Sequence, residues 1–349
     1  MKRVLALSVL VGAIVAVAAV AGTTQSASAK PTAGSLVGTG ASFPFPLISK
    51  WIPAVDQAYG IKVTYSPTGS SAGIAGITAR TVDFGASDAP LSPDQLTACK
   101  GCVVIPWALA GTSIPYNLPG LNKRLRLSGP VIAQMYLGEI TNWSDNKIKS
   151  LNPGVNLPDQ KVVPVFRSDG SGTTYNFTEY LSSVSPAWKS KVGFNTTVNF
   201  PAGTGARGSS GVAGVVKTTA GALTYVDADY SIKNKFTMAA IQNRAGSFVL
   251  PGIKQVKAAV EATVPKVVKT TADLKIVDPP KSAGKLAYPI STFTYVIAET
   301  TSGDKAADLR KFTYWAITQG QKFSIPLLFV PLPNQVQVYA GKQIRKIQA

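Results

Sequence analysis

One short segment of the 349-residue chain carries residue types suited to holding a tetrahedral oxyanion. Arg167-Ser168-Asp169-Gly170-Ser171-Gly172-Thr173 places an arginine before a turn of glycines and hydroxyl residues, and a helix-like stretch follows. A guanidinium group contacts two oxygens of one phosphate or sulfate ion at once. Glycines let the backbone approach the ion, and a helix start offers free N–H groups with a positive dipole end. The segment therefore predicts an oxyanion receptor in which Asp169 holds Arg167 in place.

Two further turns have the same character. Ala41-Ser42-Phe43 and Gly69-Ser70-Ser71 each come after a strand-like stretch and before a helix-like one. Ligands of open α/β sheets bind at the carboxyl ends of the strands, where such turns lie. Any one of these turns alone is well explained by helix capping, because Ser and Thr are favoured caps. Three of them, together with Arg167 and Asp88, indicate one anion held from several sides.

Strand-like and helix-like stretches alternate along the chain, which predicts an α/β fold with a parallel sheet. The length that remains after the N-terminal segment, about 320 residues, suggests two domains rather than one. The predicted strands span residues 61–65, 82–88, 103–105, 114–116, 162–166, 223–226 and 288–298. The predicted helices span residues 48–55, 74–79, 129–137, 254–261 and 305–318.

The first residues, 1–29, have the features of a secretory signal peptide. Lys2 and Arg3 precede an almost entirely apolar stretch, residues 4–21, and Ala27-Ser28-Ala29 provides small residues for cleavage. The alternative is an uncleaved membrane anchor, since about 18 apolar residues approach the ~20 that span a bilayer. We favour cleavage after Ala29 and expect an extracytoplasmic protein, either periplasmic or secreted to the cell envelope.

The chain is strongly basic, because 35 Lys and Arg against 17 Asp and Glu give a formal net charge of +18. A nucleic-acid partner is not expected. The basic residues are spread out, no aromatic-basic RNA-binding motif occurs, and the signal peptide directs the chain away from nucleic acid. A surface of this charge attracts small anions and could also adhere to acidic polymers of the cell envelope.

The two cysteines, Cys99 and Cys102, frame the sequence Cys-Lys-Gly-Cys. In an oxidising compartment a local disulfide is the simplest expectation. A thioredoxin-like redox role is not favoured, because the pair follows a predicted loop instead of opening a helix after a strand. A zinc site is disfavoured because zinc takes four ligands, whereas the chain offers two thiols and no His. No metal or other cofactor is therefore expected.

Several motifs, in order along the chain, resemble those of the substrate-binding protein of the high-affinity phosphate ABC transporter. The residues concerned are 38–46, 69–73, 82–91, 136–140, Trp143, 151–154, 167–173 and 288–292. The resemblance covers nearly all of the chain after the signal peptide.

This resemblance implies a type II periplasmic-binding-protein fold: two α/β lobes, with mixed sheets flanked by helices, joined by a hinge that the chain crosses twice. The crossings should fall near residues 104–107 and 289–291. Lobe I would combine residues 30–105 and 290–349, and lobe II would span residues 106–289. Closure about the hinge would bury the ligand.

The phosphate contacts of the family carry over to positions of this chain. The resemblance implies that Asp88 accepts a hydrogen bond from a protonated phosphate oxygen, that Arg167 makes a bidentate contact, and that Asp169 pairs with Arg167. The implied phosphate-binding residues are Ser42, Phe43, Ser70, Asp88, Arg167, Ser171, Gly172 and Thr173. Ser42 departs from the family, where threonine is common, but keeps the hydroxyl. The implied partners are inorganic phosphate and a membrane permease, and the receptor is expected to be a monomer that catalyses no reaction.

Asp88 predicts selectivity for phosphate over sulfate. A carboxylate beside a bound dianion is repulsive unless a proton lies between them. Phosphate carries such a proton near neutral pH and sulfate does not, and a buried acceptor without a donor is costly. The alternative is a surface aspartate that caps its own turn.

Two other functions remain open. One is a secreted phosphatase, although the chain has no His, shows no carboxylate cluster suited to two metal ions, and gives Ser171 no visible general base. The other is a receptor for a different oxyanion, such as sulfate or molybdate, against which the argument from Asp88 weighs. Adhesion to the envelope is compatible with any of these functions.

Overall fold

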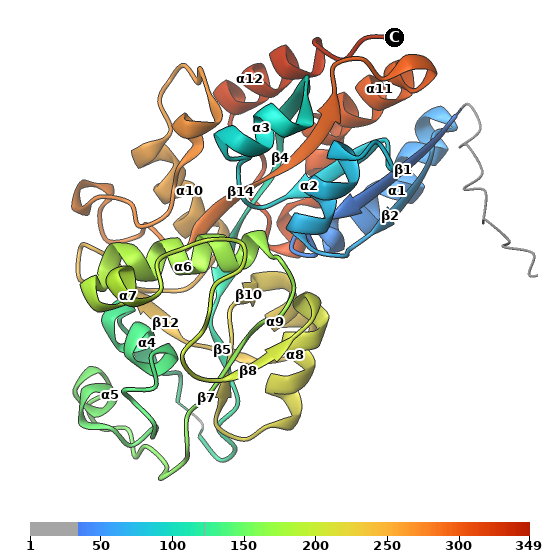
Figure 1. Ribbon diagram of the computed structural model, residues 1–349. Coiled ribbons are helices and arrows are strands. Elements are labelled where there is room, and N and C mark those ends of the chain that lie inside the picture. The colour runs from blue at the N-terminus through green and yellow to red at the C-terminus, as the bar shows by residue number, and fades with distance from the viewer. Residues whose placement is uncertain (1–33, 122) are drawn as a thin grey trace, which may run out of the picture. The chain divides into compact units, whose positions relative to one another are not determined.

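Helices surround three β-sheets in the computed structural model, which describes residues 34–121 and 123–349 (Figure 1). The α/β class expected from the sequence is confirmed. The signal peptide predicted for residues 1–29 lies outside the described residues. Within the described ranges, no helix is long and apolar enough to cross a membrane.

The three sheets contain six, five and three strands. In order across the first sheet, the strands are β10 (Val226–Asp227), β4 (Cys102–Ser113), β14 (Ser291–Glu299), β3 (Phe84–Ser87), β1 (Ser35–Gly40) and β2 (Lys62–Ser66). The second sheet contains β11 (Thr237–Met238), β5 (Pro115–Tyr116), β9 (Ala222–Leu223), β7 (Val163–Arg167) and β8 (Thr204–Ala206). The third contains β13 (Phe248–Val249), β12 (Ala240–Gln242) and β6 (Arg126–Leu127).

The α-helices are α1 (Phe45–Tyr59), α2 (Ser70–Thr78), α3 (Pro93–Cys99), α4 (Gly129–Tyr136), α5 (Asn146–Leu151), α6 (Gly172–Val184), α7 (Pro186–Lys191), α8 (Gly208–Thr218), α9 (Ala228–Lys233), α10 (Ile253–Thr263), α11 (Ala306–Ile317) and α12 (Asn334–Ile344). Short 3₁₀ helices are η1 (Thr271–Leu274), η2 (Lys281–Ala283), η3 (Gly303–Lys305), η4 (Gln319–Phe323) and η5 (Ile325–Leu327).

The six-stranded sheet contains three parallel strands whose carboxyl ends lie at one edge. β1 pairs in parallel with β2 and with β3, and β14 runs antiparallel between β3 and β4. Helix α2 packs on β1 and β3, and α11 and α12 pack on β4. Phe84, Trp107 and Phe312 meet in the core, with ring centroids between 5.7 and 6.2 Å apart. This packing fixes the edge from which the turns after β1, β2 and β3 project.

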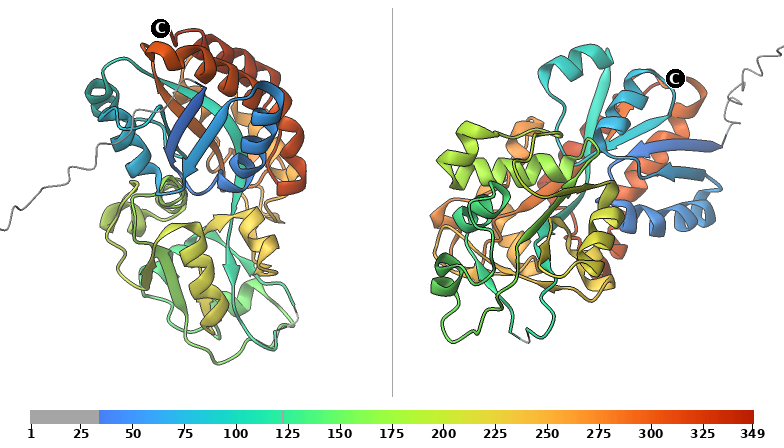
Figure 2. Two further views of the ribbon diagram at one scale, coloured as in Figure 1. Left: turned by 90° about the vertical axis from the view of Figure 1, so that its right-hand side faces the viewer. Right: turned by 60° about the horizontal axis from the view of Figure 1, so that its bottom comes forward.

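The five-stranded sheet repeats the arrangement with β7 and β8. β7 is parallel to β8 and to β9, and β5 pairs antiparallel with β9. Figure 1 shows α4 to the left of these strands, α8 and α9 to their right, and α6 above them. β4 leads from the first sheet to the second, because it ends at Ser113 and β5 begins at Pro115. In the left view of Figure 2 this teal strand runs between the two sheets.

The structure changes several of the predicted element boundaries. Helix α2 begins at Ser70 rather than at residue 74, because Gly69, with φ 107°, turns the chain directly into the helix. The predicted strand 103–105 is part of β4, which has 12 residues. Nearly all of β4 is buried on both faces, so it lacks the alternation that marks a half-buried strand. The predicted strand 223–226 divides between β9 and β10, which belong to different sheets.

Cys99 and Cys102 form the expected disulfide. The prediction that a loop precedes them is wrong, because Cys99 is the last residue of α3 and Cys102 is the first of β4. The Arg80 guanidinium lies 3.7 Å from each sulfur and forms an ion pair with Glu299. Since Glu299 ends β14, the disulfide lies at the opposite end of that strand from Ser291.

Candidate anion-binding site

Turns from distant parts of the chain meet through hydrogen bonds between hydroxyl and backbone N–H groups. Ser42, after β1, shares a hydrogen bond of 2.9 Å with the hydroxyl of Ser209 and accepts one of 3.1 Å from the Ser209 N–H. Ser70, after β2, accepts hydrogen bonds from the N–H groups of Gly172 and Asp88 at 2.9 and 3.3 Å. All three serines are buried. The carboxyl ends of β1, β2, β3, β7 and β8 therefore surround one buried centre.

Two glycines allow this close approach. A side-chain carbon on Gly172 would lie 2.6 Å from the backbone nitrogen of Asp88, nearer than atoms pack. Gly69 has φ 107°, and a side-chain carbon there would lie 2.5 Å from Oδ2 of Asp169. Any larger residue at these positions would hold the turns apart. The contacts between the turns thus explain why the sequence has glycine at both positions.

Arg167 ends β7, and its side chain is only 2% exposed. Its Nε donates a hydrogen bond of 2.7 Å to Oδ1 of Asp169, and its Nη2 donates to Oδ2 of the same carboxylate. The Gly208 N–H also donates to Oδ1, at 2.9 Å. Burial opposes ionisation of Asp169, but the hydrogen bonds and charge of Arg167, with the Gly208 N–H, hold its pKa below its ordinary value. The Asp169 carboxylate thus occupies the Nε–Nη2 edge of the Arg167 guanidinium. The N–H groups of Nη1 remain available to another oxyanion.

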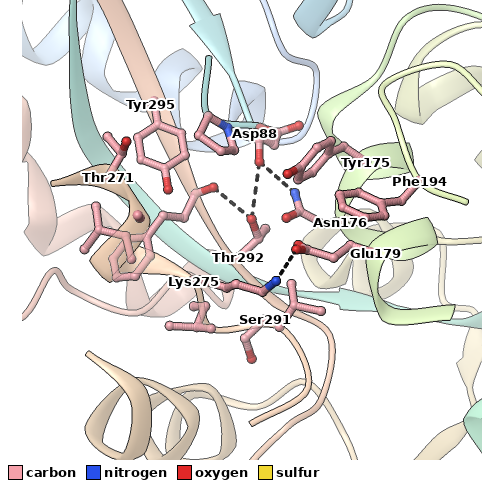
Figure 3. Close-up of a pocket in the computed structure, with 16 residues that line it drawn as sticks. Asp88, Tyr175, Asn176, Glu179, Phe194, Thr271, Lys275, Ser291, Thr292 and Tyr295 are labelled. Atoms are coloured by element: carbon pink, nitrogen blue, oxygen red, sulfur yellow. Dashed lines mark hydrogen bonds and ion pairs between the residues drawn. The ribbon is translucent and has the colours of Figure 1, made fainter. Parts of the chain in front are cut away.

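Asp88 comes directly after β3 and is fixed by its backbone. Its carbonyl oxygen accepts a hydrogen bond of 2.7 Å from Nδ2 of Asn176 in α6, and one of 3.4 Å from the Thr292 hydroxyl in β14 (Figure 3). The residue is 2% exposed. These two hydrogen bonds hold the main chain of Asp88 between α6 and β14.

The carboxyl group of Asp88 is only partly satisfied. Oδ2 accepts a hydrogen bond of 3.3 Å from the Thr173 hydroxyl, whereas buried Oδ1 has no hydrogen-bond partner among the described residues. Burial raises the pKa of Asp88 from an ordinary 3.8 to about 7, against the lowering effects of the Arg167 charge and of the Thr173 and Thr294 hydroxyls. One buried carboxylate oxygen is therefore left to accept a hydrogen bond from a ligand.

Helices α1, α2, α6 and α8 all begin at this centre. Ser171 caps α6 by accepting a hydrogen bond of 3.2 Å from the Thr174 N–H, whereas α1, α2 and α8 have no side-chain cap. The first N–H groups of a helix lack partners within the helix, and its N-terminus carries a partial positive charge. With the open edge of Arg167 beside them, these helix starts favour a small anion.

The structure brings together all the residues predicted to contact phosphate. They are Ser42, Phe43, Ser70, Asp88, Arg167, Ser171, Gly172 and Thr173. The ring of Phe43 packs on Phe329 in the core, with centroids 6.1 Å apart, so only the backbone of Phe43 can face an anion. The disulfide lies apart from this group, at the far end of β14.

Sequence reasoning missed Ser209, Gly208 and Asn176. The run 207–211, Arg-Gly-Ser-Ser-Gly, follows β8 and has the same glycine and serine pattern as residues 69–73. That pattern was a usable signal for a fourth turn. Asn176 lies one turn into α6, where an isolated asparagine has no distinguishing pattern in the sequence.

Comparisons with known proteins agree with this geometry. Residues 25–319 match the model of the PBP superfamily domain. The phosphate-binding protein PstS of Xylella fastidiosa (strain 9a5c) is 39% identical over 332 residues, which cover 93% of this chain and 89% of the relative. PstS of Pasteurella multocida (strain Pm70) is 37% identical, covering 91% of this chain and 90% of the relative. The structure of a high-affinity periplasmic phosphate-binding protein (PfluDING), bound with phosphate, shares the fold with a TM-score of 0.68 at 21% identity, covering 87% of this chain and 92% of that one.

Proposed function

Because the chain belongs to the PBP superfamily and, within it, to the family of PstS phosphate-binding proteins, we propose that it is an extracytoplasmic receptor for inorganic phosphate. The receptor captures the ion where the turns meet and delivers it to the membrane permease of a phosphate ABC transporter. One observation carries the assignment to phosphate: the buried Oδ1 of Asp88 has no hydrogen-bond partner among the described residues.

The unpartnered oxygen of Asp88 selects for a protonated ligand. Above a pKa of about 7 the carboxyl group is ionised and can only accept hydrogen bonds. A phosphate ion that keeps one proton donates that hydrogen bond, whereas sulfate has no proton to donate. Sulfate would place an anionic oxygen against a buried carboxylate, and this repulsion rejects it.

The remaining contacts follow from the donors that face the centre. Arg167 offers its Nη1 edge for a bidentate contact, and the buried hydroxyls of Ser42 and Ser70 would donate further hydrogen bonds to the ion. Asp169 holds Arg167 and, through Gly208, the start of α8. The proposed phosphate ligands are Ser42, the backbone N–H of Phe43, Ser70, Asp88, Arg167, Ser171, Gly172 and Thr173.

Two lobes closing on phosphate would create the contacts between the turns. We assign residues 30–105 and 290–349 to lobe I and residues 106–289 to lobe II, with the chain crossing between them twice. On this division the hydrogen bonds between Ser42 and Ser209 join the two lobes. Export would follow from the signal peptide predicted at the N-terminus.

A receptor is favoured over a phosphatase. The Ser171 hydroxyl accepts a hydrogen bond from the Thr174 N–H, and the chain has no His to act as its general base. Among the residues that the structure describes, no group of three or more His, Cys, Asp or Glu could hold a metal ion. The hydroxyls and N–H groups at this centre are instead arranged to bind an anion.

The test is the ratio of phosphate to sulfate affinity in Asp88→Asn. Asparagine keeps the shape of the side chain, removes the charge and adds an amide N–H that can donate to sulfate. We expect the ratio to fall at least about hundredfold, because a buried charged acceptor without a donor costs about 3 kcal/mol. Asp94→Asn, at an exposed position in α3, is the control and should keep the ratio. An unchanged ratio in Asp88→Asn would rule out the role assigned to this carboxylate.

A further inference from the structure

A cavity of about 310 Å³ borders the anion site at Asp88 (Figure 3). Asn176 and Thr292, which hold the Asp88 carbonyl, form part of its lining. The other walls come from Pro90, the first turns of α6, the η1 helix with the residues that follow it, and the start of β14. The phosphate receptor function proposed above assigns no role to this cavity.

Aromatic rings form much of the lining. Tyr175 and Phe194 pack edge to face, with centroids 5.4 Å apart and an interplanar angle of 78°. Figure 3 shows Tyr295 across the cavity from this pair. The faces of aromatic rings carry partial negative charge and attract cations. Rings on two sides of one cavity therefore suit a positively charged group between them.

A carboxylate lies in the same wall. The Glu179 side chain is 11% exposed and forms an ion pair of 2.7 Å with Nζ of Lys275, whose side chain is 64% exposed. Among the described residues that line the cavity, Lys275 is the one basic side chain. The Glu179 carboxylate, on α6, is thus buried in the cavity wall, whereas the Lys275 side chain is mostly exposed to solvent. An ion pair with so exposed a lysine adds little stability, so another cation can replace the lysine.

We propose that this cavity binds a small organic ammonium ion, whose positive nitrogen replaces Nζ of Lys275 beside Glu179 and lies among the rings of Tyr175, Phe194 and Tyr295. The cavity volume is at the lower end of the range for small-molecule sites, which limits the ligand to a few carbon atoms. Recognition would combine the carboxylate charge with cation–π attraction.

Choline is a suitable probe, and the uncharged analogue in which a carbon atom replaces the nitrogen is its matched control. Calorimetry or ligand-observed NMR on the protein, with and without added phosphate, measures both. We expect choline to bind at millimolar concentration or below, and the uncharged analogue to bind at least about tenfold more weakly. The two molecules have nearly the same shape, so the difference reports the charge.

Variants of the ion pair should change choline binding in opposite directions. Glu179→Gln should weaken it at least about tenfold, because a charge-assisted contact is lost. Lys275→Met should strengthen it about threefold, because the competing ammonium group is removed. Phe194→Leu should weaken choline binding while leaving that of the uncharged analogue almost unchanged.

Three results would overturn the inference: equal binding of choline and its uncharged analogue, no response of choline affinity to Glu179→Gln, or no binding of choline at millimolar concentration. Phosphate titration of the same three variants tests the receptor function independently of choline binding. None of them alters a proposed phosphate ligand, so phosphate affinity should stay unchanged. Failure to bind phosphate in the wild-type protein would contradict the receptor proposal without affecting the choline result.

Discussion

Replacing Asp88 by asparagine should stabilise the ligand-free protein, and the gain should grow with pH. Burial raises the pKa of Asp88 from 3.8 to about 7 in the folded state. The same carboxyl group titrates near its ordinary value in the unfolded chain, so between about pH 4 and about pH 7 unfolding releases a proton. A shift of about three pKa units corresponds to about 4 kcal/mol. The contribution of this group to the unfolding free energy is therefore fully present below about pH 4 and is lost as pH rises to about 7.

Denaturant unfolding of anion-free protein over a series of pH values measures this effect. The unfolding free energy of Asp88→Asn minus that of the wild-type protein should increase by about 4 kcal/mol from about pH 4 to about pH 8. Asp227 also has a raised pKa, because of its burial and the neighbouring charge of Asp229. The Asp88 charge also raises the pKa of Asp227, so Asp88→Asn lowers that pKa and adds to the increase of the difference with pH.

The variant Asp94→Asn, at an exposed position in α3, is the control for removing a carboxyl group outside the site. A pH-independent difference for Asp88→Asn would refute the reasoning. It would mean that the Asp88 carboxyl group pays no desolvation penalty in the folded protein, and the physical basis for rejecting sulfate would be lost with it.

Three further predictions concern affinity, pH and the disulfide. Gly172→Ala should lower phosphate affinity at least about hundredfold in a calorimetric titration, because its side-chain carbon would lie 2.6 Å from the Asp88 nitrogen; an unchanged affinity would show that the turns need not approach so closely. Sulfate affinity should rise as pH falls below about 7, because a protonated Asp88 can donate a hydrogen bond; titrations across that range that show no rise would contradict it. Changing both Cys99 and Cys102 to Ser should lower the unfolding free energy, measured by denaturant unfolding, by about 2 kcal/mol. Phosphate affinity should stay unchanged, because the disulfide lies at the far end of β14 from Ser291. A loss of phosphate affinity would contradict this separation of the disulfide from the site.

The main features of the site could be predicted from the sequence because they are local. Ser70 and Gly172 lie in turns between a strand and a helix, and Arg167 ends a strand, so their positions follow from the order of the elements. Parallel pairing of the strands then brings the turns to a common edge. The residues whose positions were predicted correctly are those whose placement depends on this local order.

The features that were missed depend on contacts between distant segments. Ser209 matters because its hydroxyl and N–H reach Ser42, which is 167 positions earlier in the chain. The extent of β4 depends on its pairing with β14 along the whole strand, where burial of both faces removes any alternation. The raised pKa of Asp88 results from burial by several elements at once, and no motif in the sequence records it.

The most direct test of the central claim is a calorimetric titration of the chain from Lys30 onward, stripped of bound anions, with phosphate and then with sulfate. At about pH 9, where Asp88 is ionised and phosphate still carries one proton, we expect tight binding of one phosphate per chain and no heat from sulfate. Comparable binding of the two ions would contradict the selectivity assigned to Asp88, and binding of neither would contradict the receptor function itself.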